Sequence, residues 1–209
     1  MPRRRKKPVQ ESGDTRAAVL KAAELLFAQK GYLGARVAEI ADEAGVDKRL
    51  VFYYFGTKHG LYAEILESFF RGAEPLLEAF LRKRGQRPDP SDVDRFMENM
   101  TLFIQQNHHS VRILFREFLD GGVLLEDFLD ARVLPLFRLW RTYYPGLFPG
   151  TQGTPKEADH MLLTLSGMNL FYFLVQPLME RVWQEDPLQP ERIEERKAFL
   201  RRYTRGRFR

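Results

Sequence analysis

Apolar residues recur at helical spacing along most of the chain. In the first such stretch they are Val19, Ala22, Ala23, Leu26 and Phe27. Residues three and four positions apart share one face of a helix, so this stripe predicts an amphipathic helix from about Asp14 to Lys30, with Gly31 as its cap. Stripes of the same period continue to Tyr203. The pattern therefore predicts an all-α protein of about nine helices.

Two short helices are predicted at Val37–Ala44 and Lys48–Phe55. Gly45 stands between them, where the end of a helix favours a left-handed residue. Asp47 can accept a hydrogen bond from the first turn of the second helix. Helix, glycine turn and helix form the pattern of a helix-turn-helix. The same step also serves as plain packing in all-α proteins, so the pattern alone leaves both interpretations open.

The residues around this step resemble the DNA-binding domain of TetR-family transcriptional regulators. The resemblance covers about residues 15–66 without a gap, and its landmarks are Phe27 to Gly31-Tyr32, Ile40-Ala41, Ala44-Gly45-Val46, Phe52 to Phe55, and Lys58 followed by Leu61. It implies a three-helix DNA-binding domain and a larger helical C-terminal domain that binds an effector and dimerises. Beyond residue 66 the chain resembles the family only in length and helical character.

These features divide the chain into a basic arm (1–13), a DNA-binding helix-turn-helix domain (14–57) and an effector-binding and dimerisation domain (58–209). The net charge of +5 arises in the first ten residues, where Arg3 to Lys7 give five positive charges, because residues 11–60 hold seven residues of each sign and residues 61–209 hold 21 of each. A basic arm can follow phosphates or enter a minor groove. A solubilising tail would have the same composition.

The resemblance assigns DNA contacts by position. The residues concerned are Arg36, Lys48, Arg49, Leu50, Phe52, Tyr53, Tyr54 and Lys58. Arg36 follows Ala35 where the family usually has a hydroxyl residue, and it can itself reach a phosphate. Arg49-Leu50 replaces a common Gly-Thr pair, and an arginine there can pair with guanine in bidentate geometry. Arg49 is also consistent with a solvated surface charge, and Phe52 with core packing.

A second set of residues, in the C-terminal half, gives candidates for an effector pocket. They are Phe96, Met100, Phe103, Asn107, Arg112, Phe115, Phe118, Met168, Asn169 and Tyr172. Taken singly, each is typical of a protein core. The family resemblance implies a pocket, and ligand pockets are mostly apolar with a few polar groups. Asn169 lies within an apolar helix, so it is either a ligand contact or part of a satisfied interhelical hydrogen bond.

The helix that contains Asn169 is apolar on nearly every side from Met161 to Val175. Thr154 caps its start and Pro177 kinks or ends it. Such a helix must be covered all round, and one protomer of this size offers a single inner face. We therefore expect a homodimer through the last two helices.

Several classes of function are disfavoured by what the sequence lacks. It contains no cysteine and no run of eighteen apolar residues, and its four histidines have no metal-ligand spacing. No nucleophile elbow or phosphate-binding glycine loop is present. The expectation is a cytoplasmic, non-enzymatic, dimeric regulator without a metal, a cofactor or a membrane. It would be a repressor on a palindromic DNA operator, released by an apolar small-molecule effector. The alternative is a helical partner-binding protein with no DNA role.

Overall fold

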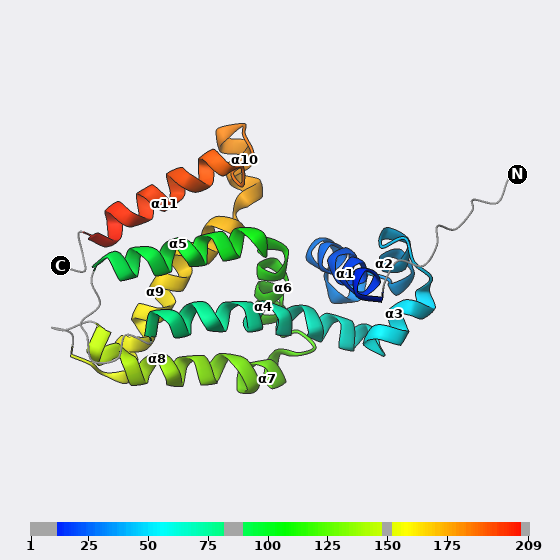
Figure 1. The fold of residues 1–209 in the computed structure, drawn as a ribbon, viewed down its shortest axis with the longest axis horizontal. Coiled ribbons are helices and arrows are strands. Elements are labelled where there is room, and N and C mark those ends of the chain that lie inside the picture. Colours follow the sequence, from blue (N-terminus) through cyan, green and yellow to red (C-terminus); the bar gives the residue numbers. More distant parts are fainter. Residues whose placement is uncertain (1–11, 82–89, 148–151, 206–209) are drawn as a thin grey trace, which may run out of the picture. The chain divides into compact units, whose positions relative to one another are not determined.

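The computed structural model describes residues 12–81, 90–147 and 152–205, and every regular element in them is a helix (Figure 1). The all-α fold class is thus confirmed. The chain divides into two compact units, Met1–Glu67 and Ser68–Arg209. The first unit therefore extends beyond the boundary expected after Thr57. The basic arm lies almost entirely outside the described residues.

The first unit contains α1 (Ser12–Gly34), α2 (Val37–Glu43), α3 (Lys48–Phe55) and the first turns of α4 (Lys58–Leu81). The apolar stripe predicted on α1 is buried throughout. Gly31 has a φ of 72° as expected of a cap, but helical bonding resumes beyond it as far as Gly34. The rings of Phe27 and Tyr62 meet edge to face at 4.9 Å, which joins α1 to α4.

The second unit contains the rest of α4 with α5 (Pro90–Gln106), α6 (His108–Asp120), α7 (Leu125–Phe128), the π-helical turn η1 (Leu129–Val133), α8 (Leu134–Leu147), α9 (Pro155–Leu174), α10 (Gln176–Trp183) and α11 (Pro190–Arg205). Helix α9 contacts α5, α6 and α8, and α11 runs beside α5 (Figure 1). Trp140 is fully buried, and its indole N–H donates to the carbonyl of Ala158 at 2.7 Å.

Two prolines affect their helices differently from the prediction. Proline lacks a backbone N–H, so the sequence predicts a kink or restart at Pro75, but helix α4 continues through it. The apolar pattern from Leu124 to Tyr144 predicts one helix with a kink at Pro135, whereas the structure divides this stretch into α7, η1 and α8. Pro135 is the second residue of α8, so the irregular turn falls immediately before it. This position fits proline, because its ring clashes with the carbonyl four residues earlier in a regular α-helix.

The ends of α9 agree with the prediction, with one change of partner. The backbone N–H of Glu157 donates to the Thr154 hydroxyl at 3.2 Å. A capping box predicts that the Glu157 carboxylate accepts from the Thr154 N–H, but it accepts from the Gly153 N–H at 2.9 Å. Helix α9 ends at Leu174 and α10 follows at an angle of 61°. No single helix in the described ranges has the length and composition to cross a membrane; only the bent pair α9 and α10 meets that test together.

Candidate nucleic-acid interface and candidate ligand cavity

Local interactions define both ends of α3. Gly45 and Gly56 have φ angles of 67° and 68°, a region in which a side chain is strained. The Asp47 carboxylate accepts from the Arg49 N–H at 2.8 Å and so caps the helix. Val51 is 1% exposed and anchors the inner face. The eight-residue helix is thereby held with its opposite face in solvent.

The exposed face of α3 carries most of the residues assigned to DNA. Lys48, Arg49, Leu50, Phe52 and Tyr53 are all exposed. Tyr53 is 79% exposed and Phe52 is 40% exposed, so Phe52 is not a core residue. The Lys48 ammonium lies 5.6 Å from the centre of the Phe52 ring. Basic, aromatic and apolar groups on one narrow helix match the phosphates, base edges and thymine methyl groups of a major groove.

Tyr54 and Lys58 are only partly exposed. The Tyr54 ring packs edge to face on Tyr53 at 5.1 Å. The Lys58 ammonium lies 4.6 Å from the centre of the Tyr32 ring, and partial burial lowers the pKa of Lys58. The ring contact fixes the direction of the lysine side chain.

The start of α2 lacks the usual hydroxyl cap, and an acidic residue takes part of its role. The Glu39 carboxylate accepts from the Arg36 backbone N–H at 3.1 Å and from the Lys30 ammonium at 3.0 Å. The hydrogen bond from Lys30 lowers the pKa of Glu39. The Arg36 side chain makes no capping bond and remains exposed. It is therefore available to a phosphate.

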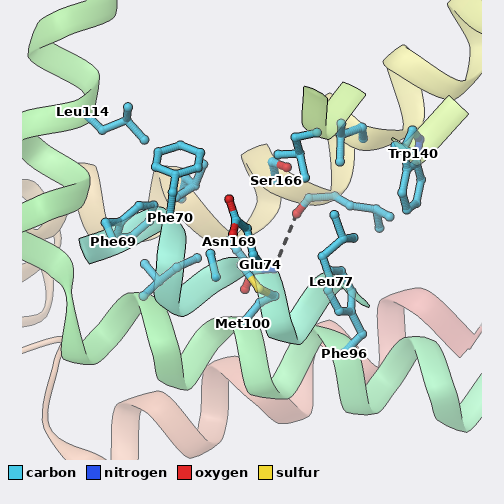
Figure 2. A pocket seen from close by; sticks show the side chains of 16 residues that line it. Phe69, Phe70, Glu74, Leu77, Phe96, Met100, Leu114, Trp140, Ser166 and Asn169 are labelled. Atoms are coloured by element: carbon cyan, nitrogen blue, oxygen red, sulfur yellow. Dashed lines mark hydrogen bonds between the residues drawn. The ribbon is translucent and has the colours of Figure 1, made fainter. Parts of the chain in front are cut away.

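A cavity of about 150 Å³ lies within the second unit, between α4, α5, α6, α8 and α9. Most of the lining residues are apolar, and Figure 2 shows Phe69, Phe70 and Leu114 towards one end and Phe96, Leu77 and Trp140 towards the other. Glu74, Asn169 and Met100 lie between these two groups (Figure 2).

Asn169 belongs both to the cavity wall and to a buried hydrogen-bond network. It is 3% exposed, and its Oδ1 lies 2.6 Å from the hydroxyl of the fully buried Thr101. Its Nδ2 donates weakly to the Leu165 carbonyl at 3.4 Å. The interhelical hydrogen bond expected as one alternative therefore exists between α9 and α5.

The structure divides the residues expected to form one effector pocket. Phe96, Met100 and Asn169 line the cavity. Met168 and Tyr172 line a separate groove of about 620 Å³ formed by α9, α10 and α11. Phe103, Asn107, Arg112, Phe115 and Phe118 are absent from the linings of both hollows. Phe118 is 42% exposed, and the Asn107 amide donates to the Phe103 carbonyl at 2.7 Å.

The groove places a partly buried cation against aromatic rings. The Arg196 guanidinium lies 5.1 Å from the Tyr172 ring, and burial lowers the pKa of Arg196. The Tyr172 hydroxyl donates to the Pro187 carbonyl at 2.7 Å, and burial raises the pKa of that hydroxyl. These contacts join α9 to the segment that precedes α11.

Sequence reasoning missed several residues that line the cavity. Phe69 continues the apolar stripe of α4, so the sequence predicts it in the core, and Ser166 indicates only a close approach of helices. Glu74 and Trp140 carry no signal beyond their place in a helix. The only available signal was the aromatic pair Phe69-Phe70 on a helix that leads out of the DNA-binding domain.

The fold and the exposed face of α3 define a helix-turn-helix protein of the DNA-binding class. Residues 19–65 match the sequence profile described as bacterial regulatory proteins, tetR family. The chain is 30% identical over 108 residues to the HTH-type transcriptional repressor SCO4008 of Streptomyces coelicolor, an alignment that covers 52% of each protein. It is 32% identical over 129 residues to the HTH-type transcriptional repressor NicS of Pseudomonas putida, covering 60% of this chain and 58% of NicS. The chain thus spans little more than half the length of these relatives.

The crystal structure of HlyIIR, a hemolysin II transcriptional regulator, has a similar fold. It superposes with a TM-score of 0.59 at 22% identity, and the match covers 88% of this chain and 98% of that one. Residues 19–65 therefore match the conserved part of the tetR family of bacterial regulatory proteins, and the fold of the described residues is similar to that of HlyIIR.

Proposed function

We propose that this protein is a ligand-responsive transcriptional repressor that binds a palindromic DNA operator as a homodimer. The observation that carries the proposal is the exposed face of α3, where Lys48, Arg49 and Tyr53 project from a helix whose two ends and inner face are fixed. The names of the relatives SCO4008 and NicS, both repressors, support the direction of the response.

Within this proposal the residues of α3 have distinct roles. Arg49 reads a base edge, Leu50 contacts a thymine methyl group, and Tyr53 and Lys58 hold the phosphate backbone. Phosphate contacts give affinity and salt dependence, whereas base contacts give sequence preference. Arg36 and Lys48 add phosphate contacts beside them, and Phe52 and Tyr54 pack next to the Lys48 and Tyr53 side chains.

Dimerisation through α9, α10 and α11 is supported by a surface that is unusually apolar for exposed helices. Its large exposed side chains are Leu163, Phe171, Leu178, Val182, Trp183, Phe199 and Tyr203. Phe171, Trp183 and Phe199 of this set line the same groove, and exposed apolar side chains that gather in this way mark an interaction site. A twofold axis would then present two copies of α3 to half-sites about one helical turn (~34 Å) apart.

Helix α4 supplies the route from the ligand to DNA. It is one continuous helix that begins with Lys58 and lines the cavity through Phe69, Phe70 and Leu77. A guest that displaces α4 acts on the same element that carries a DNA-binding lysine. Couplings of this kind amount to about 1–3 kcal/mol.

The DNA role is tested by the salt dependence of operator binding, measured by fluorescence anisotropy. The double variant Tyr53→Ala and Lys58→Ala should weaken binding on every sequence and lower the salt slope by about one per protomer, because a phosphate contact is lost. Lys156→Ala, an exposed lysine at the start of α9, is the matched control and should leave both unchanged. A double variant that binds as tightly as the wild type would favour a helical partner-binding protein with no DNA role.

The dimer is tested by sedimentation. Leu178→Glu together with Val182→Glu should give monomers, because both side chains lie exposed on α10 and a buried charge opposes association. Leu119→Glu, at a leucine on α6 that is 80% exposed, is the control and should remain dimeric.

A further inference from the structure

Few polar groups line the cavity, and they differ in how far they are already hydrogen-bonded within the protein. Sixteen residues line it, and among them Glu74, Ser166 and Asn169 are the ones with polar side chains. Asn169 is already engaged by Thr101 and Leu165. The lining residues include no lysine, arginine or histidine. The strongest polar group offered to a guest is therefore a carboxylate.

Glu74 has a partner on only one of its oxygens within the described residues. Its Oε1 accepts from Nη1 of Arg132 at 3.2 Å, a link between α4 and η1. Arg132 does not line the cavity. The Glu74 side chain is 46% exposed and that of Arg132 is 31% exposed, so the carboxylate lies at the partly open edge of the cavity. Its Oε2 is free to accept from a guest.

Like the Glu74 carboxylate, the aromatic lining favours a guest with a positive charge. Phe69, Phe70, Phe96 and Trp140 present rings to the cavity (Figure 2). The faces of aromatic rings are negative and attract an ammonium group, most strongly when water is excluded. A carboxylate guest would meet the charge of Glu74 and gain no basic partner from the lining.

The volume limits the size of the guest. A cavity of about 150 Å³ matches an engineered apolar cavity, in another protein, that accepts one benzene molecule. The guest is therefore about as large as one aromatic ring.

We infer that the cavity binds a small lipophilic amine, with the ring against Phe69, Phe96 and Trp140 and the ammonium group on Glu74. This inference rests on the proposed ligand response and specifies its chemistry. An ammonium group on Glu74 competes with Arg132 for the same carboxylate, so binding weakens the link between α4 and η1. The guest thereby acts on the helix that carries Lys58.

Three probes of nearly equal size separate charge from shape: benzylamine, benzyl alcohol and benzoate. Binding to the full-length protein is measured directly by isothermal titration calorimetry at neutral pH. Benzylamine should bind about fivefold more tightly than benzyl alcohol, the upper range for a partly exposed ion pair, and benzoate should bind most weakly. Glu74→Gln should reduce the ratio of benzylamine to benzyl alcohol affinity to about one while it retains benzyl alcohol binding.

Two further variants complete the test. Glu78→Gln removes the same charge from α4 at a residue that does not line the cavity, and it should keep the preference for benzylamine. Arg132→Gln should bind benzylamine more tightly than the wild type, because the competing cation is gone. Circular dichroism verifies that each variant is folded.

The inference is overturned if benzoate binds as well as benzylamine, if Glu74→Gln keeps the preference, or if none of the three probes binds. These results leave the DNA role intact, because operator binding by the unliganded protein is measured separately. Conversely, amine binding by a protein that fails to bind any operator would refute the proposed function and retain the cavity assignment.

Discussion

The buried pair Thr101 and Asn169 gives a prediction whose size follows from its geometry. Thr101→Val replaces the hydroxyl with a methyl group of similar volume. It leaves Oδ1 of Asn169 buried and without its donor, because that oxygen is 2.6 Å from the lost hydroxyl. An unsatisfied buried acceptor costs about 1–3 kcal/mol, so we expect a loss of ~2 kcal/mol in the free energy of unfolding.

Asn169→Leu should lower the free energy of unfolding by less, about 0–1 kcal/mol. The Thr101 hydroxyl also lies 2.8 Å from the Met97 carbonyl, so its single proton keeps an acceptor when the amide is removed. The double variant has neither polar group and should resemble Asn169→Leu. The coupling energy of the double-mutant cycle should therefore be about 1–2 kcal/mol.

Urea unfolding followed by circular dichroism, at one fixed protein concentration, measures all four proteins. Fixing the concentration matters because the stability of a dimer depends on it. Thr142→Val is the control, since this threonine bonds the Arg138 carbonyl at 3.0 Å on an exposed surface and should cost far less. Additive losses, or a larger cost for Asn169→Leu than for Thr101→Val, would refute the hydrogen-bond assignment.

Three further predictions concern packing, base recognition and pH. Gly72→Ala should destabilise the fold by about 1 kcal/mol, because the new Cβ would lie 2.7 Å from the Phe103 ring and the strain exceeds the gain in helix propensity. Replacing one thymine by uracil in each operator half-site should weaken wild-type binding about fourfold per methyl group and leave Leu50→Ala unaffected. Arg141→Gln should lower the melting temperature at pH 7 but much less at pH 3. Hydrogen bonds from Arg141 lower the pKa of Asp159 in the folded protein. The ion pair therefore stabilises the fold fully above the pKa of Asp in the unfolded chain, about 3.9, and this stabilisation is lost as the pH falls through the lower pKa of the folded protein.

A specific result would contradict each of these three predictions. Urea unfolding of Gly13→Ala, where an added Cβ meets no atom within 4 Å, should show no loss, and an equal loss in both alanine variants would exclude the Phe103 contact. Uracil that weakens Leu50→Ala as much as the wild type would remove Leu50 from base recognition. A constant difference in melting temperature between pH 7 and pH 3 would exclude Asp159 as the partner of Arg141.

Helix α3 was predictable because its determinants are local. Gly45 and Asp47 define its start through backbone conformation and one capping bond, and both are visible in a short stretch of sequence. The exposure of Tyr53 follows from the spacing of Val51 on the inner face. These positions do not depend on how distant helices pack.

The cavity was only partly predictable because it depends on helices far apart in the chain. Met168 and Asn169 are neighbours in sequence, yet they face different hollows of the second unit. Helical periodicity locates an apolar face but does not tell which partner covers it. Phe118 illustrates the limit, since it follows the apolar stripe of α6 and is 42% exposed. Glu74 had no signal at all, because its role depends on the aromatic residues that other helices bring around it.

The central claim is that the exposed face of α3 reads DNA sequence. It is tested most directly by selecting binding sites from a random duplex library with the wild-type protein and with Arg49→Ala. The wild type should enrich a palindromic site, and Arg49→Ala should enrich the same site without its preference for one G·C pair in each half, a discrimination worth about 1–3 kcal/mol. No enriched site, or an identical preference at every position in both proteins, would contradict the account.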